Sequence, residues 1–176
     1  MTSGVADEAV EVVDPDGRVE RLVTRAEMRA GNLRHRSTYI VVRDDVGRVL
    51  VHQRADWKDI WPSRWDVAFG GICGVGEDWL TAAARELAEE AGLEGELVDL
   101  GPVRFENDRT RCVGRVFVTV ATATPTFPDG EVVDHRWVAP DELATWASTH
   151  ELCDDSAAVV LPLLHDLVGR AAPAGR

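Results

Sequence analysis

The sequence lacks the features of several protein classes. Its 176 residues include only three cysteines, Cys73, Cys112 and Cys153, which are widely spaced and form no CxxC pair, so the chain offers neither a zinc motif nor a disulfide framework. No apolar run reaches the roughly 18 residues that a membrane-spanning helix needs. The stretch from Met1 to Glu11 has no apolar core of a secretory signal. We therefore expect a cytoplasmic protein without a membrane partner.

Positive charge is also scarce. The chain has 19 Lys and Arg residues against 31 Asp and Glu residues, and its formal net charge is -12. Proteins that bind nucleic-acid polymers need a basic surface, so DNA and RNA are excluded as main partners. A small phosphorylated ligand is still compatible with this charge, because a few local cations and a bound metal can reverse the field inside one cleft.

The composition that is present is typical of a globular protein. Hydrophobic residues make up 45% of the chain and charged residues 28%. The length fits one domain with a sizeable core, and there is no internal repeat or linker. We predict a single domain over residues 1–176, with loose ends at about 1–9 and 169–176.

Short runs rich in β-branched residues, separated by turn residues, predict eight strands. They span residues 10–14, 19–24, 38–43, 48–52, 64–69, 95–100, 111–122 and 132–138. Helices are predicted at 78–91, ending at Gly92, at 140–147 and at 156–168, where Pro162 indicates a kink or a later start. Mostly antiparallel strands with helices on their faces predict an α+β sandwich.

Helical periodicity over residues 78–91 separates an apolar face from an acidic one. The apolar positions are Leu80, Ala83, Ala84, Leu87 and Ala91. On the opposite face lie Glu86, Glu89 and Glu90, at spacings where like charges repel one another, and their place near the helix C-terminus opposes the helix dipole. Because a hard cation such as Mg²⁺ would reverse both penalties, this face predicts a metal site.

The same segment resembles a family motif. Residues 71–93 read GICGVGEDWLTAAARELAEEAGL, which matches every fixed position of the Nudix box, GX5EX7REUXEEXGU with U aliphatic. The resemblance implies an α/β/α sandwich with a mixed, largely antiparallel sheet. It also implies a Nudix hydrolase that uses Mg²⁺ or Mn²⁺ to cleave the diphosphate bond of a small substrate, such as a nucleoside diphosphate linked to a further group, by attack of water on phosphorus. It permits a homodimer.

The resemblance implies a role for each residue of the box by position. Glu86 and Glu90 match metal ligands, with the carbonyl of Gly71 as a third ligand. Glu89 matches either a further ligand or the base that polarises water. Arg85 matches an arginine that holds the catalytic glutamates in place through charge-assisted hydrogen bonds.

Two further acidic residues have less defined roles. Glu77, the first glutamate of the box, matches a structural residue behind the site. Glu131 belongs to an acidic segment before the last predicted strand, and this segment resembles a loop that supplies an extra catalytic carboxylate in some relatives. A plain surface turn explains Glu131 equally well.

A looser resemblance covers residues 31–137. It is to the Nudix branch related to isopentenyl-diphosphate isomerase, and by position Arg54 and Lys58 match the cations that bind the diphosphate. A guanidinium fork and a point charge beside a metal are suited to that task, although two exposed cations in a polar loop would look the same. Trp61 lies in the same loop, where its ring would either stack on a nucleobase or pack in the core.

The isomerase activity does not follow from this likeness. Gly70 stands where the isomerases carry a proton-donating cysteine, and of their metal-binding histidines only His35 is present, since Met28 and Ile72 replace the others. The sequence thus favours a metal-dependent hydrolase. Two alternatives are an isomerase-like enzyme and a non-catalytic Nudix-fold module that only binds its ligand.

Overall fold

A computed structural model describes residues 6–164. It contains a two-stranded sheet, β1-β2, and a six-stranded sheet with strand order β5-β4-β3-β7-β6, in which β8 pairs with the other side of β4. The strands are β1 (Ala9–Val13), β2 (Val19–Thr24), β3 (His35–Arg43), β4 (Val49–Arg54), β5 (Trp65–Asp66), β6 (Val98–Glu106), β7 (Arg111–Val120) and β8 (Val132–Val138). The described helices are α2 (Arg25–Ala30), α3 (Trp79–Ala91), α4 (Leu143–Ser148) and α5 (Asp154–Val159).

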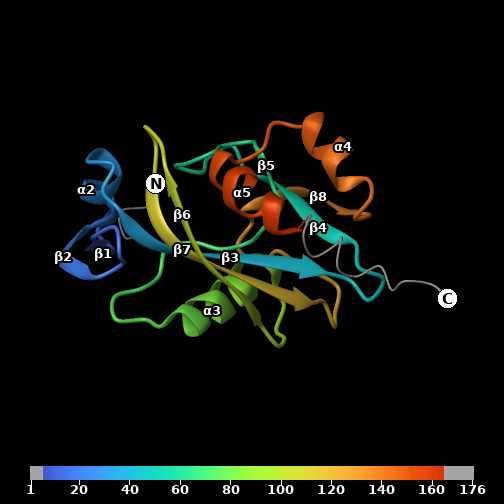
Figure 1. Cartoon of the computed structure of the whole chain (residues 1–176), viewed down its shortest axis with the longest axis horizontal. Helices are drawn as coiled ribbons and strands as arrows, with labels where there is room; N and C mark the ends of the chain where they lie inside the picture. The colour runs from blue at the N-terminus through green and yellow to red at the C-terminus, as the bar shows by residue number, and fades with distance from the viewer. Residues whose placement is uncertain (1–5, 165–176) are drawn as a thin grey trace.

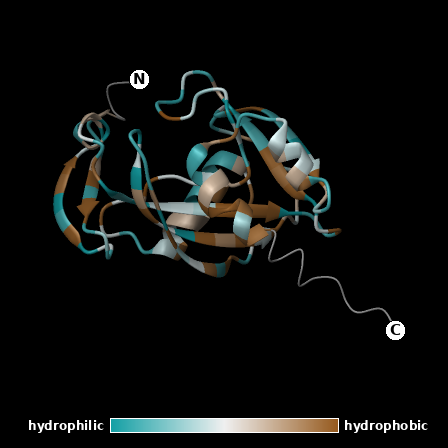
Figure 2. Ribbon diagram, turned by 45° about the horizontal axis from the view of Figure 1, so that its top comes forward, coloured by the Kyte–Doolittle hydropathy of each residue, from teal (hydrophilic) through white to brown (hydrophobic). Residues whose placement is uncertain are grey.

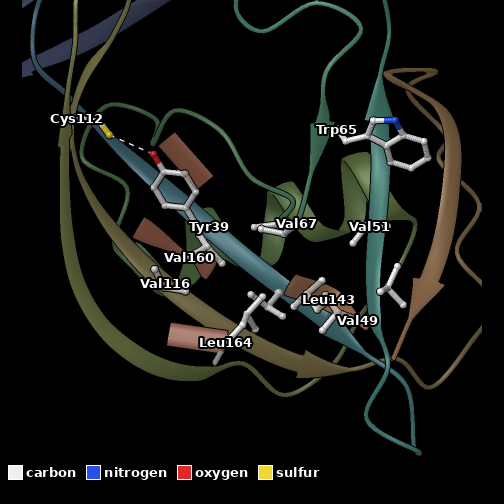
Figure 3. Close-up of a cluster of buried hydrophobic side chains, with 13 residues drawn as sticks. Tyr39, Val49, Val51, Trp65, Val67, Cys112, Val116, Leu143, Val160 and Leu164 are labelled. Carbon is white, nitrogen blue, oxygen red and sulfur yellow. Dashed lines mark hydrogen bonds between the residues drawn. The ribbon is translucent and has the colours of Figure 1, made fainter. Parts of the chain in front are cut away.

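The large sheet separates two layers of helices. Helix α3 packs on one face, against a buried cluster that includes Ile40, Phe69 and Leu87. Helices α4 and α5 cover the opposite face, as Figure 1 shows. Figure 3 shows the cluster under them, to which β3 contributes Tyr39 and α4 contributes Leu143. The strands at the centre are largely hydrophobic and the loops at the rim largely hydrophilic (Figure 2). The predicted α/β/α sandwich is confirmed.

The sheet is mixed, as expected. β3 runs parallel to β7, while β6 with β7 and β4 with β8 are antiparallel. β3 and β4 pair only at Arg43 and Val49 and then diverge. The chain that follows β5 enters this gap and bridges to β3 at Ile40–Phe69 and Ser37–Ile72. The divergence leaves room for a cavity at that end of the sheet.

A glycine is needed where this inserted segment passes β3. The backbone of Gly70 has φ +139°, which L side chains rarely adopt, and a Cβ there would lie 2.0 Å from the carbonyl oxygen of Thr38. Any larger residue would push the segment away from β3. Gly70 therefore fixes the path of the chain just before the Nudix box.

Helix α3 has the predicted ends but a different buried face. Asp78 caps the first turn by accepting the N–H groups of Leu80 and Thr81, and Gly92 closes the helix with φ 63°. The buried residues are Ala82, Ala83, Glu86, Leu87, Glu90 and Ala91. The predicted apolar face was thus wrong in part, because Leu80 and Ala84 are exposed.

The acidic face is partly buried, which the helical wheel did not indicate. Glu86 and Glu90 are buried, and only Glu89 is exposed. The physical reason is that Gly70 and Gly71 have no side chains, so the helix turns these two carboxylates towards them. A helical wheel that equates burial with apolar character cannot detect such a contact.

Helix α2 was not predicted, although the sequence carries its signal. Thr24 accepts the N–H of Glu27 through its hydroxyl at 3.2 Å, and the Glu27 carboxylate accepts the N–H of Thr24 at 2.8 Å. This Thr-x-x-Glu arrangement is a capping box. It follows β2 directly, so that the N-terminal hairpin and α2 form one unit.

Other boundaries differ from the predictions. β5 is shorter than the strand predicted at 64–69, and β6 begins later and runs further than 95–100. α5 begins two residues before the predicted start, and the turn at Val160 interrupts the helix just before Pro162. Ala9 already belongs to β1, and the predicted loose end at 169–176 lies outside the described residues. No helix within residues 6–164 is long and apolar enough to cross a membrane.

Candidate functional site

A cavity of about 650 Å³ lies where β3 and β4 diverge. Its walls come from α3, from the loop after β4, from the loop before β8, and from the beginnings of α2 and α5. All predicted site residues except Glu77 line it, namely His35, Arg54, Lys58, Trp61, Gly71, Arg85, Glu86, Glu89, Glu90 and Glu131. The fold therefore gathers residues that are up to 96 positions apart in the chain into one space.

Two buried carboxylates of α3 lie against the glycine pair. Glu86 is 9% exposed and Glu90 is 6% exposed. The N–H of Gly70 donates to Glu90 Oε2 at 2.9 Å, and a Cβ on Gly71 would come within 2.7–2.9 Å of the Glu86 carboxylate. Burial raises the pKa of both carboxyl groups, that of Glu90 well above its ordinary value with a further contribution from the charge of Glu86.

Arg85 connects the acidic residues of the box. Its Nη1 donates to Glu86 Oε1 at 2.7 Å and to Glu89 Oε2 at 3.1 Å. Its Nε and Nη2 form a fork with the two oxygens of Glu77, at 3.0 and 2.9 Å. The hydrogen bond with Glu77 is the largest factor that raises the pKa of Arg85. Glu77 also accepts the N–H of Gly74, so it fixes both the arginine and the loop before α3.

The loop before β8 brings two more carboxylates to the same end of the cavity. One oxygen each of Glu90, Asp129 and Glu131 lie within 4.8 Å of one another. The sequence analysis missed Asp129 and did not decide the place of Glu131. No local signal identifies them, because they reach α3 only through the pairing of β4 with β8. Burial alone would raise the pKa of Glu131, but the ion pair with Lys58 holds it below its ordinary value.

Arg54 is a buried cation beside this acidic end. Its Nη2 makes one long hydrogen bond, at 3.4 Å, to the carbonyl of Ile60, and its buried Nε has no partner in the described part of the chain. Lys58 differs, since its ammonium group is engaged by Glu131. The cavity thus holds one guanidinium whose hydrogen-bonding capacity is largely unused.

Trp61 lies in the cavity wall. It is 2% exposed, and the guanidinium carbons of Arg64 and Arg109 lie 5.0 and 5.7 Å from its ring centroid. This burial favours the packing interpretation of Trp61 over stacking on a nucleobase. Trp57, which is 60% exposed and also lines the cavity, has the accessible ring.

His35 does not belong to a metal cage. It is 3% exposed, its Nδ1 lies 3.1 Å from the carbonyl of Leu33, and burial lowers its pKa to about 4. Ile72, at one of the replaced histidine positions, lines the same cavity, as do Thr110 and Cys112, which align with the two metal-binding glutamates of the isomerases. The Cys112 thiol lies 3.2 Å from the Tyr39 hydroxyl, as Figure 3 shows. No carboxylate or second histidine joins them at those positions.

Cys73 is not a substitute for the missing proton donor of the isomerases. It is buried and is not among the residues that line the cavity. Burial raises the pKa of its thiol to about 12. With Gly70 at the donor position, the cysteine that does line the cavity is Cys112, and burial raises the pKa of its thiol to about 11.

The structure adds residues that the sequence analysis did not consider. Arg25 and Arg29 of α2 line the cavity and share the carboxylate of Asp59, at 3.4 and 3.0 Å. Asp66, the last residue of β5, and Asp155, the second residue of α5, also line it. The arginines were missed because α2 was missed, and the aspartates because their neighbours are distant in the sequence.

Comparisons with known proteins agree with this geometry. A family model described as "NUDIX domain" matches residues 33–157. The uncharacterized Nudix hydrolase YfcD of Salmonella typhi is 36% identical over 150 residues, which cover 85% of this chain and 80% of the relative. The uncharacterized Nudix hydrolase PA4841 of Pseudomonas aeruginosa is 31% identical over 150 residues, 85% of this chain and 89% of the relative.

Solved structures show the same fold at lower identity. DR0079 from Deinococcus radiodurans has a TM-score of 0.71 at 24% identity and covers 94% of this chain and 100% of its own. The NUDIX domain of Shewanella oneidensis NrtR, crystallised with ADP ribose, has a TM-score of 0.62 at 18% identity and covers 85% and 100%. At these identities the likeness concerns the fold alone.

Proposed function

Because the chain belongs to the Nudix family, whose hydrolases act on phosphorus-containing anhydrides, we propose that it is a divalent-metal-dependent pyrophosphohydrolase of a nucleoside diphosphate linked to a further group X. The observation that carries the proposal is the juxtaposition in one cavity of buried carboxylates with a cation, Arg54, that has no ion-pair partner within residues 6–164. Neither the buried carboxylates nor a buried arginine without an ion-pair partner among residues 6–164 is expected in a cavity that binds only apolar ligands.

The donor set fits Mg²⁺ or Mn²⁺. Glu90, Asp129 and Glu131 offer oxygens within 4.8 Å of one another, and Glu86 lies close enough to raise the pKa of Glu90. Hard divalent cations prefer such oxygen ligands, and an uncompensated group of buried carboxylates is costly. We assign the cation to Glu86, Glu90 and the carbonyl of Gly71 from the predicted set, joined by Asp129 and Glu131. When bound, it would neutralise negative charge on the phosphoryl oxygens.

The protein side chains divide the remaining work. Glu89, the exposed carboxylate at the cavity edge, takes the proton of the water that attacks phosphorus, while the bond from phosphorus to the bridging oxygen breaks and the leaving phosphate carries the electron pair. Arg85 holds Glu86 and Glu89 in position through the hydrogen bonds at 2.7 and 3.1 Å. Its fork with Glu77 keeps the guanidinium from turning away.

Arg54 and Lys58 bind the diphosphate. The unused donors of Arg54 suit the bidentate geometry of a phosphate group. Lys58 holds Glu131 until the substrate is present and then shares its charge with a phosphoryl oxygen. The crystal of the Shewanella NrtR domain with ADP ribose supports nucleoside diphosphates as the first compounds to test.

The proposal is tested by removing the charge of the buried carboxylates. We expect Glu90→Gln and Glu86→Gln each to lower kcat by about a thousandfold or more on a panel of dinucleotides and nucleotide sugars. The reason is that stabilisation of transition-state charge is the largest single contribution to such rates. The fold should persist. Phosphate release is measured with and without chelator, and Mg²⁺ binding by calorimetry.

Glu94→Gln serves as the matched control, since Glu94 is an exposed glutamate just beyond the end of α3. It should leave turnover and metal binding unchanged. Turnover that survives both buried substitutions, or that is insensitive to chelator in the unmodified protein, contradicts the assignment.

A further inference from the structure

We propose that the end of the cavity bordered by α5, between Tyr39, Trp61 and Asp155, is a recognition chamber for the group attached to the diphosphate, and that it selects groups that carry hydroxyl or amino hydrogen-bond donors. This inference rests on the proposed function, because it concerns the substrate of the same cavity. It assigns a role to residues that the hydrolytic chemistry does not use.

The first observation is an unpaired buried acceptor. Asp155 lines the cavity, its Oδ2 accepts the hydroxyl of Tyr39 at 3.2 Å, and its buried Oδ1 has no partner in the described part of the chain. A buried carboxylate oxygen without a donor is unfavourable, and native structures rarely leave one so. The atom is enclosed in this arrangement, and a donor on a bound ligand would satisfy it once the Asp155 carboxyl group turns towards the cavity.

The second observation is an unpaired buried donor at the same end. Trp61 also lines the cavity, and its buried Nε1 has no partner among the described residues. Arg64 links this ring to the beginning of α5, since its guanidinium lies over the ring and its Nη1 donates to Asp154 Oδ1 at 2.5 Å. The chamber therefore presents an acceptor from α5 and a donor from the loop after β4.

The charges along the cavity indicate how a substrate lies. Arg54 ends β4, which pairs with β8 next to Glu131 and with β5, the strand that contains Asp66. A diphosphate held by Arg54 next to the acidic end would direct its attached group towards Asp66 and Asp155. The metal end and the chamber thus receive the two parts of one molecule.

The same charges define the chemical class of the attached group. Asp66 adds a second negative charge beside Asp155, so a further phosphate or carboxylate would be repelled there. A purely alkyl group would leave both Oδ1 of Asp155 and Nε1 of Trp61 without partners. A sugar or another group with several hydroxyl or amino groups satisfies both, because each hydroxyl can donate and accept.

The test compares two diphosphates that differ only in these donors. Ribose 5-diphosphate carries free hydroxyl groups and n-pentyl diphosphate carries none. In the unmodified protein with chelator present, we expect calorimetry to show that the ribose compound binds about tenfold more tightly, the effect of one hydrogen bond to a charged group. Equal affinities overturn the proposal.

The variants locate the preference. Asp155→Ala should remove the tenfold difference by weakening ribose binding while leaving pentyl binding unchanged. Asp141→Ala is the matched control, because Asp141 is an exposed aspartate just before α4 that is not among the residues that line the cavity. It should retain the preference. Equal loss in both variants overturns the proposal.

Trp61→Phe provides a second variant that keeps the ring and removes only the Nε1 donor. It should weaken ribose binding several-fold and leave pentyl binding unchanged, and it covers the case in which Asp155→Ala fails to fold. Ribose preference without any metal-dependent hydrolysis refutes the proposed function alone. Hydrolysis of both compounds without preference refutes the chamber alone.

Discussion

The two ends of the cavity differ in how their polar groups are satisfied. At the α3 end, Arg85, Glu77, Glu86 and Glu90 are joined by hydrogen bonds of 2.7–3.0 Å to one another and to backbone N–H groups. At the α5 end, Trp61 Nε1 and one oxygen of Asp155 are buried and have no partner among residues 6–164. The first end is preorganised for chemistry, which requires fixed geometry. The second end has polar atoms that only the proposed ligand would satisfy, so it can select one ligand over another.

The largest effect is expected from loosening the ordered end. Arg85→Lys keeps the positive charge but cannot reach Glu77, Glu86 and Glu89 at once, because an ammonium group is a point charge rather than a planar fork. We expect kcat to fall by about a hundredfold with little change in KM, since misplacing catalytic groups by about 1 Å has that order of effect. Steady-state kinetics measures it.

Arg48→Lys is the control for this substitution, because Arg48 pairs with Asp44 at the surface, outside the cavity. It should not change kcat. If Arg85→Lys retains full kcat, the hydrogen bonds of Arg85 do not position the carboxylates, and the contrast between the two ends loses its functional meaning.

Arg54 stands between the two ends, and its removal should affect binding more than chemistry. We expect Arg54→Ala to raise KM by about tenfold or more and to lower kcat less, because a clamp holds the ground-state diphosphate as well as the transition state. Arg21→Ala, at an exposed arginine of β2, is the control. If Arg54→Ala lowers kcat by the same factor by which it raises KM, Arg54 acts in the chemical step, as we propose for the residues of the α3 end.

The buried carboxyl group of Asp155, at the α5 end, should make the free energy of unfolding depend on pH. Burial first, and the neighbouring charge of Asp66 second, raise the pKa of Asp155 from 3.8 to about 6. The folded protein therefore binds this proton more tightly than the unfolded chain, so the stability that it contributes is fully present below pH 3.8 and is lost as pH rises through 6. Above that pH the buried charge is a net penalty.

Asp155→Asn removes the penalty. We expect the variant to be more stable than the unmodified protein at pH 8 by on the order of 2 kcal/mol, and the advantage to shrink as pH falls from 6 to 4. Urea unfolding at several pH values measures it, with Asp141→Asn, at an exposed aspartate before α4, as the control. An advantage that does not depend on pH would show that the Asp155 carboxyl group is not strained by its site.

The smallest effect concerns the wall that α2 adds to the cavity. Thr24→Ala removes the side-chain half of the capping box and should cost about 1 kcal/mol in the free energy of unfolding. Thr124→Ala, at an exposed threonine, is the control and should cost less than about 0.5 kcal/mol. A null effect at Thr24 would mean that packing, not the cap, holds α2 in place.

Sequence reasoning reached much of the ordered end and little of the other. It identified the ends of α3 from periodicity and caps, and the site residues of the box and the α/β/α fold from the resemblance to the Nudix box. It placed Arg54 and Lys58 by resemblance, and both line the cavity. It overlooked the capping box of Thr24 and Glu27, a local signal that was present.

The remaining errors have a different origin. Asp129 reaches Glu90 through strand pairing, Asp155 reaches Tyr39 across 116 positions of the chain, and the ring of Trp61 is covered by Arg64 and by Arg109. Apart from the contact between Trp61 and Arg64, which are three positions apart, no short window of sequence contains these contacts. The rotation of α3 that buries Glu86 and Glu90 likewise depends on Gly70 and Gly71, which lie outside the helix.

The sequence by itself determined the family, the acidic helix with its caps, and the layered fold, because these follow from patterns between near neighbours in the chain. Only the tertiary structure decided which carboxylates face one another, which cation lacks a partner and where the cavity leaves polar atoms unsatisfied. Those properties arise when the divergence of β3 and β4 brings distant segments to one place, and their energies depend on burial, which no residue possesses before the chain has folded.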